Sequence, residues 1–445
     1  MNYLFSNKDL KNLILPLVLE QALAITVGMA DTMMVSSVGE VAVSGVSLVD
    51  MLNYLIFSIF AALATGGAVV VSQNIGAGKL KDARGAAKQL LYTVIFFSTL
   101  ITVLVLCFRR GLLSLLFGRI DEDVMEAALL YLSISALSFP FLGIYNSCAA
   151  LFRSMGMTNI TFNVSVIGNL INVVGNAIGI FVLHLGVAGV ALPTLISRIV
   201  MAGIVYVMLR NPERTICFER DGFRLDFRTI RNILYIGIPS SVENGIFQLG
   251  RVMVVSIISA FGTVQIAANG VANSIDSVGC IMGQAMNLAM ITVIGTCVGA
   301  GDPEQVKHYL KKLLLITYAG TACIIIPCLL FLNPILSLFS LGEETQKLAY
   351  ILIFIHNGIA LFLWPLAFTF PNMLRASNDV KFPMAVSIFS MWSFRIGFSY
   401  ILGIRFGLGA IGVWIAMIID WIFRILCFTL RYLHGDWKKT MYRLV

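Results

Sequence analysis

The chain has 445 residues, of which 58% are hydrophobic and only 12% are charged, and its formal net charge is +8. Soluble domains carry about 25% charged residues, so this composition excludes an ordinary soluble globular protein. Because a polypeptide in lipid must satisfy its own backbone hydrogen bonds, we expect an all-α integral membrane protein.

Twelve apolar stretches are long enough to cross a membrane, since a helix needs about 20 residues to span about 30 Å of hydrocarbon. The segment before the first stretch contains Lys8 and Lys11 but no small-residue cleavage site, so we expect no signal peptide. The twelve predicted transmembrane helices lie near residues 13–37, 46–73, 90–108, 127–151, 161–183, 187–209, 232–258, 268–298, 310–332, 348–372, 382–403 and 409–431.

Lysine and arginine are distributed unequally between the two sides of these helices. If the N-terminus is cytoplasmic, most basic residues, including the six arginines from Arg210 to Arg231, lie in inner segments. This bias predicts a multi-pass protein of the cell membrane, typical of a bacterial inner membrane, with both termini in the cytoplasm. The net charge is then an orientation signal, and we expect no nucleic-acid partner. The outer loops hold only Arg109, Arg110, Arg119, Lys347 and Arg405.

The two halves of the chain resemble each other. One constant shift along the sequence superposes them without a gap, which predicts a duplicated six-helix lobe. We expect an N-terminal lobe at 1–209, a basic cytoplasmic linker at 210–231, and a C-terminal lobe with a short cytoplasmic tail at 232–445. The superposed positions include Pro16 on Pro239, Glu20 on Glu243, Gly39 on Gly262, and the IGAG of 75–78 on the VGAG of 298–301.

The segment IGAGK at 75–79 lacks the full GxxxxGK[ST] phosphate-loop pattern, and no strand precedes it. We therefore interpret it as a helix end followed by a turn, and expect no nucleotide partner and no organic cofactor. Uphill transport would then draw on an ion gradient. Neither HExxH nor GxSxG occurs, and paired histidines are absent, so we expect no enzyme.

Asp31 lies within the first predicted helix, where a carboxylate costs roughly 2.5 to 3.5 kcal/mol to insert. Glu20 recurs in the second half as Glu243, which indicates an architectural role for both. Asp31 does not recur, because its counterpart is Val254. Asp31 therefore belongs to the first half alone.

Charge balance also differs between the halves. The first half places Glu20, Asp31, Asp50 and Arg198 in predicted helices, an excess of negative charge, so Asp31 is the carboxylate that most needs a partner. We interpret His356, alone in its helix, as a packed or hydrogen-bonded residue. The second half has three charges of each sign, which pairing would satisfy: Glu243, Arg251, Asp276, Arg395, Asp420 and Arg424.

Three neutral polar side chains are predicted at depths near that of Asp31. At about 1.5 Å per residue, Asp31, Asn176 and Thr194 lie roughly 10 to 12 Å from the external side, and Asn172 about 18 Å. Taken singly, each neutral residue is explained by hydrogen bonds between helices. Together with Asp31 they provide an oxygen-only shell suited to Na⁺, while the carboxylate alone would carry H⁺.

The chain is similar over nearly its whole length to the multidrug and toxic compound extrusion (MATE) family. The resemblance rests on the order of VGMADTMMVSSVG, the GAG turn, LFRS, and NxxxN before LGVAGVALPT. It implies two lobes forming a V-shaped bundle around a central cavity, and export of bulky, often cationic organic compounds in exchange for Na⁺ or H⁺.

The resemblance also implies roles for single residues. Asp31 would be the cation-binding acid of the first lobe, and Pro16 the bend in the first helix. Asn176 stands where some members carry aspartate, and Phe247 where others carry a glutamate, so the resemblance does not support a cation site in the second lobe. The implied co-ligands of Asp31 are Asn172, Asn176 and Thr194, with Asn146 of YNSCAALFRS at a further polar position.

We therefore expect a secondary active multidrug efflux antiporter that exports bulky cationic organic compounds in exchange for Na⁺ or H⁺. Its partners would be small molecules and the lipid bilayer, and we expect a monomer. The alternative is a flippase for a lipid-linked precursor. Such a protein usually has a cationic cavity, whereas the buried charge of the first half is mostly acidic.

Overall fold

A computed structural model describes residues 3–118, 121–218, 224–339 and 341–441. Within these ranges all regular structure is helical and no strand occurs. The all-α fold predicted from composition is therefore confirmed. Arg119, one of the predicted outer-loop residues, and residues 219–223 of the predicted linker lie outside the described residues.

The chain divides into two compact units, and the division falls inside helix α8 (Phe227–Ser259). The N-terminal unit is Asn7–Ser241. The C-terminal unit begins at Val242 and includes the start of the chain up to Ser6. That short start is held by α11, because the Phe5 backbone N–H donates to the Tyr309 hydroxyl at 2.8 Å.

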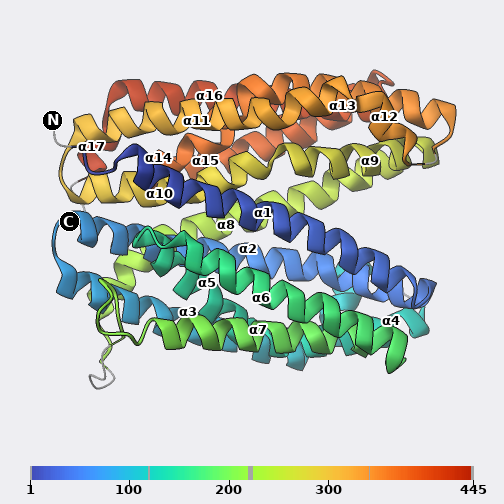
Figure 1. Cartoon of the computed structure of the whole chain (residues 1–445). Coiled ribbons are helices and arrows are strands. Elements are labelled where there is room, and N and C mark those ends of the chain that lie inside the picture. Colours follow the sequence, from blue (N-terminus) through green and yellow to red (C-terminus); the bar gives the residue numbers. More distant parts are fainter. Residues whose placement is uncertain (1–2, 119–120, 219–223, 340, 442–445) are drawn as a thin grey trace. The chain divides into compact units, whose positions relative to one another are not determined.

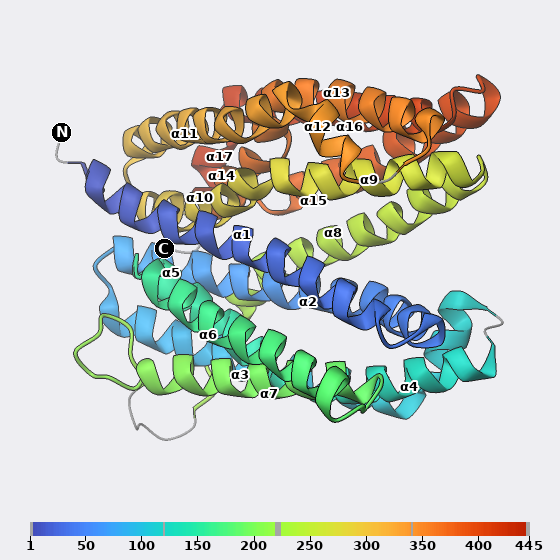
Figure 2. The same ribbon diagram turned by 45° about the vertical axis from the view of Figure 1, so that its right-hand side comes forward.

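In the N-terminal unit, α6 packs against α1 and α7, while α2 packs against α3, α4 and α5. Figure 1 and Figure 2 both show α6 beside α1 and α7. The helices are α1 (Asn7–Ser36), α2 (Glu40–Gly76), α3 (Leu80–Phe117), α4 (Glu122–Leu137), α5 (Phe139–Ser154), α6 (Thr158–Ala177), the π-helical η1 (Ile178–Val182) and α7 (Ala188–Met208).

In the C-terminal unit, α13 packs against α9, α11 and α16, and α10 packs against α11 and α14. The helices after α8 are α9 (Thr263–Gly279), α10 (Ile281–Gly299), α11 (Pro303–Leu330), α12 (Leu332–Ser337), α13 (Glu343–Trp364), η2 (Pro365–Thr369), α14 (Pro371–Ala376), α15 (Lys381–Ser390), η3 (Met391–Ile396), η4 (Ser399–Arg405), α16 (Gly409–His434) and α17 (Asp436–Met441).

Ten helical spans among the described residues are long and apolar enough to cross a membrane, or eleven when α4 and α5 are counted as one bent span. The predicted stretch 127–151 thus consists of two helices that meet at Ser138 with a bend of 44°. The stretch 268–298 is likewise divided at Cys280 into α9 and α10. α8 is not among the ten, and its polar residues, such as Glu243 and Arg251, lower its hydropathy.

The internal repeat is visible in the backbone as well as in the sequence. Gly39 and Gly262, which the repeat superposes, precede α2 and α9 with φ values of 129° and 97°. Gly78 and Gly301, a second superposed pair, follow α2 and α10 with φ values of 72° and 71°. Glycine is the residue that adopts positive φ without a steric cost. IGAGK is therefore a helix end and a turn, as predicted.

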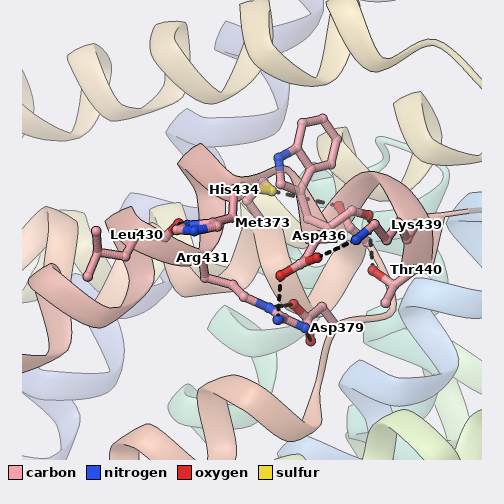
Figure 3. Close-up of polar contacts among 10 residues, drawn as sticks. Met373, Asp379, Leu430, Arg431, His434, Asp436, Lys439 and Thr440 are labelled. Atoms are coloured by element: carbon pink, nitrogen blue, oxygen red, sulfur yellow. Dashed lines mark hydrogen bonds and ion pairs between the residues drawn. The ribbon is translucent and has the colours of Figure 1, made fainter.

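The last helix is anchored to the C-terminal unit by an ion-pair cluster (Figure 3). Arg431 at the end of α16 places Nε 2.8 Å from Asp379 Oδ2 and Nη1 2.7 Å from Asp436 Oδ2. The hydrogen bond from the Lys439 ammonium, together with the positive charge of Arg431, holds the pKa of Asp436 below its ordinary range. Trp437 beside it is buried, so α17 is a packed part of the unit.

Pro16 lies inside the continuous helix α1 and cannot donate to the carbonyl of Asn12, one turn earlier. Thr158 of α6 compensates, because its hydroxyl lies 3.0 Å from the Asn12 carbonyl oxygen and 2.9 Å from that of Leu13. Thr158 itself is completely buried. Neighbouring Ser and Thr side chains commonly satisfy the carbonyls that a proline frees in a membrane helix.

Replacing Thr158 with valine should therefore lower the free energy of unfolding by about 1 to 3 kcal/mol, because the Asn12 carbonyl loses its donor. Denaturant unfolding of the purified protein in detergent measures the change. Thr26→Val is the matched control, since the exposed Thr26 hydroxyl bonds only within its own helix, to the Ala22 carbonyl. Equal losses in the two variants would contradict the assigned role of Thr158.

Candidate cation-binding site

The end of α1, the end of α6 and the first half of α7 meet at Asp31 in the N-terminal unit. Two glycines of this region allow the close approach of α6 and η1 to α7. A Cβ on Gly175 would lie 2.6 Å from Pro193 Cβ, and one on Gly179 would lie 2.4 Å from the Gly189 oxygen. A larger residue at either position would clash with α7, so these two glycines allow α6 and η1 to pack closely against α7 near Thr194.

Asp31 accepts hydrogen bonds from two amides of α6. Asn176 Nδ2 lies 2.9 Å from Asp31 Oδ1. We assign the Asn172 amide with its nitrogen toward Asp31, 3.0 Å from Oδ1 and 3.1 Å from Oδ2, because its oxygen then faces the Thr194 hydroxyl at 2.9 Å. The structure thus brings together the four side chains that depth counting placed near one another.

Burial differs among these four residues. Asn176 is completely enclosed and Asn172 is buried, whereas Asp31 and Thr194 are partly exposed. Asn176 Oδ1 is enclosed and has no hydrogen-bond partner among the described residues. A buried acceptor left in this way costs about 1 to 3 kcal/mol, so a donor or a cation beside it is favourable.

The donor set is chemically suited to a hard cation. Carboxylate, amide carbonyl and hydroxyl oxygens are the ligands that such ions prefer. In the observed arrangement both amide nitrogens face the carboxylate, and rotation of either amide would present an oxygen to a cation bound beside Asp31. A proton needs only the carboxylate. The residues therefore fit either ion.

Two residues implied by the family resemblance are not members of this hydrogen-bonded group. Asn146 is on α5, and no hydrogen bond among the described residues joins it to Asp31. Pro16 lies in the first half of α1, beside Thr158, whereas Asp31 lies near the end of the same helix. The proposed ligand shell thus comprises Asp31, Asn172, Asn176 and Thr194.

Charge counting in the sequence missed the environment of Asp50. Its Oδ1 accepts from the Tyr131 hydroxyl at 3.2 Å and from Asn53 Nδ2 at 3.5 Å. Arg198 is close enough to attract Asp50 electrostatically, and it donates to the Ser138 hydroxyl at 2.5 Å. Asp50 therefore has a cation nearby. Asp31, by contrast, is hydrogen-bonded to neutral groups.

Glu20 and Glu243, the residues that recur one turn after the prolines, both join helices. Glu20 accepts from the Thr161 hydroxyl at 3.2 Å and the Tyr145 hydroxyl at 3.4 Å. Glu243 forms an ion pair with Arg375 Nη2 at 2.7 Å. Arg375 lies in the last turn of α14.

Asp420 of α16 is held by two arginines of the C-terminal unit. Its Oδ1 lies 2.9 Å from Arg424 Nε, one turn along the same helix, and its Oδ2 lies 3.3 Å from Arg395 Nε in η3. Ser390 also donates to Oδ1. Arg251 is exposed, and the ion pairs between described residues do not include it. Asp420, which is fully buried, is therefore held in place by the two arginines Arg395 and Arg424.

Asp276 has a partner that sequence reasoning did not assign. His356 Nδ1 lies 3.1 Å from Asp276 Oδ1. His356 is 2% exposed and lies between the rings of Trp414 and Trp421, at centroid distances of 4.7 and 4.8 Å. The sequence did contain a signal for this contact, because the second half has one histidine and the aspartate Asp276 in predicted helices.

Comparisons with known proteins match this fold and repeat. The sequence profile of the MatE family matches residues 16–178 and again 239–401, so the two matches begin at the superposed residues Pro16 and Pro239. The Probable multidrug resistance protein NorM of Thermotoga maritima is 27% identical, over 97% of this chain and 93% of that protein. The human Multidrug and toxin extrusion protein 1 is 23% identical, over 95% of this chain and 74% of its own length.

A crystal structure of MATE in the bent conformation superposes with a TM-score of 0.88 at 23% identity, covering 98% of this chain and 96% of that one. The fold of the whole chain is therefore the MATE fold. Since the family profile covers both halves of the repeat, this multi-pass membrane protein belongs to the MatE family of multidrug efflux transporters.

Proposed function

We propose that this chain is a secondary active antiporter that exports bulky cationic organic compounds, and that Asp31 binds the coupling ion, Na⁺ or H⁺. The observation that carries the proposal is the set of partners around Asp31. Asn172 and Asn176 donate hydrogen bonds to it but carry no charge. An uncompensated carboxylate inside a membrane helix gains stability when a cation or proton neutralises it.

The coupling ion would act by changing which conformation is stable. A ligand shifts an equilibrium only when it binds the two states with different affinities. Neutralising Asp31 removes the charge that the two amides now solvate, so α1 and α6 no longer need the same contacts. We place the rearrangement in α1, where Pro16 removes one helical hydrogen bond and the Thr158 hydroxyl donates to the freed Asn12 carbonyl instead.

The names of the relatives support the substrate class. Both are multidrug proteins, and the human one is also a toxin extrusion protein. In this chain, the charged residues inside the helices of the first half are mostly acidic, namely Glu20, Asp31 and Asp50 against Arg198, and this favours cationic compounds. We further propose that the transporter works as a monomer, with both termini in the cytoplasm, as the distribution of lysine and arginine predicts.

Replacing Asp31 with asparagine should abolish ion-driven efflux while membrane insertion remains intact, because the variant lacks the charge that the ion neutralises. Efflux of a cationic dye from proteoliposomes, under separately imposed Na⁺ and H⁺ gradients, measures the loss and identifies the ion. Asp82→Asn, at an exposed position in the first turn of α3, is the matched control.

Unchanged efflux by the Asp31 variant would refute the proposed site. Flipping of a lipid-linked precursor without gradient-driven dye efflux would favour the flippase instead.

Replacing Asn176 with alanine should raise the coupling-ion concentration at half-maximal efflux by roughly 10-fold or more, the usual effect of removing a partner of a cation ligand. Titration of the driving ion in the same proteoliposomes measures the shift. Asn169→Ala is the control, because Asn169 lies on the same helix but donates to Ser165 at 3.2 Å. An equal shift in both variants would show a general disturbance of α6.

A further inference from the structure

Asp276 and His356 form a pair that the proposed ion site does not use. His356 Nδ1 lies 3.1 Å from Asp276 Oδ1, and the histidine side chain is 3% exposed against 24% for the aspartate. The imidazole is therefore enclosed, while its carboxylate partner reaches the surface of the C-terminal unit. The repeat superposes Asn53 and Ser133 on these two residues, so the pair belongs to the second half alone.

Three side chains surround the imidazole of His356. The Asp276 carboxylate is the first. The indoles of Trp414 and Trp421 are the others, and both meet the imidazole in T-shaped contacts, with interplanar angles of 72° and 62°. Trp414 is held in place by a hydrogen bond of 2.9 Å from its Nε1 to Asn269 Oδ1 of α9. The cage is thus built from three packed helices, α9, α13 and α16.

Other charged and titratable groups lie near Asp276 and His356 on the neighbouring helices. On α16, Asp420 and Arg424 form an ion pair, and Arg395 of η3 pairs with Asp420 and also attracts Asp276 electrostatically. Cys280, between α9 and α10, donates from Sγ to Asp276 Oδ2 at 4.0 Å, and the thiol of Cys328 on α11 is close enough to sense the charge of Asp276. Arg251 of α8 is exposed. The remaining neighbours of α13, η2 (Pro365–Thr369) and α12 (Leu332–Ser337), contain no titratable residue.

We propose that Asp276 and His356 form a second proton-binding site, located in the C-terminal unit. In the neutral form of the ring, Nδ1–H donates to Asp276. One proton from water then adds to the other ring nitrogen, and the net charge of the pair changes from −1 to 0. The site does not depend on the proposed role of Asp31.

The two neighbouring tryptophans provide a direct measurement, because an imidazolium in contact with an indole quenches its fluorescence. The tryptophan emission of the purified protein in detergent should fall in one step as the pH is lowered. His356→Gln should remove this step. Asp276→Asn should move its midpoint to lower pH by about 1 unit or more, because the charge that stabilises the imidazolium is lost.

Two controls separate this site from other effects. His308→Gln, in the first turns of α11, should keep the step, since His308 contacts Tyr3 and Tyr309 rather than a tryptophan. Asp31→Asn should also keep it, so failure of the proposed antiport mechanism leaves the measurement unaffected. Should His356→Gln not fold, Trp414→Phe and Trp421→Phe should each reduce the amplitude of the step while His356 is retained.

Absence of a step in the wild-type protein across the pH range in which the protein stays folded would overturn the proposal. A step of full amplitude in His356→Gln would also overturn it, as would an unchanged midpoint in Asp276→Asn.

Discussion

The membrane imposes one constraint on which the polar structure of this protein depends: a charge buried in a helix must find its partner inside the protein. The carboxylates of Asp420 and Glu243 meet it with arginine, and that of Asp276 with a histidine. Asp420 contacts Arg395 and Arg424, Glu243 contacts Arg375, and Asp276 contacts His356. Asp31 meets the constraint with two amides instead, and this difference makes it the candidate ion site.

The duplicated scaffold shows which features serve the fold and which serve a site. The glycines on either side of the second predicted helix of each half recur with positive φ, because both halves need turns at these places. The ionisable groups do not recur in the same way. Val254 replaces Asp31, and Asn53 replaces Asp276, so each of these two carboxylates stands at a position that is uncharged in the other half. The positions that the two halves share therefore form the scaffold, and the positions at which the halves differ include the residues of the proposed binding sites.

Much of this architecture was predictable because lipid restricts the backbone to helices and fixes their length. The grouping of Asp31, Asn176 and Thr194 followed from their depth, since each residue advances a helix by about 1.5 Å, and Asn172 lies one helical turn from Asn176. Lateral position was not predictable, because rotation about a helix axis and the choice of neighbouring helix depend on packing. For this reason the Asp276–His356 contact, the Glu243–Arg375 pair and the position of Asn146 required the structure.

The type of partner decides whether a buried carboxylate can exchange an ion. Two arginines around Asp420 compensate its charge permanently, and removing either cation from such a pair costs several kcal/mol. An amide satisfies a carboxylate without neutralising it, and its oxygen and nitrogen exchange roles by rotation about one bond. Asp31 between Asn172 and Asn176 is therefore stable enough to remain in the membrane, yet still gains energy from an arriving cation. A transporter needs a carboxylate that is stable in the membrane without its ion and still binds the ion reversibly, because an ion that is bound permanently cannot drive a transport cycle.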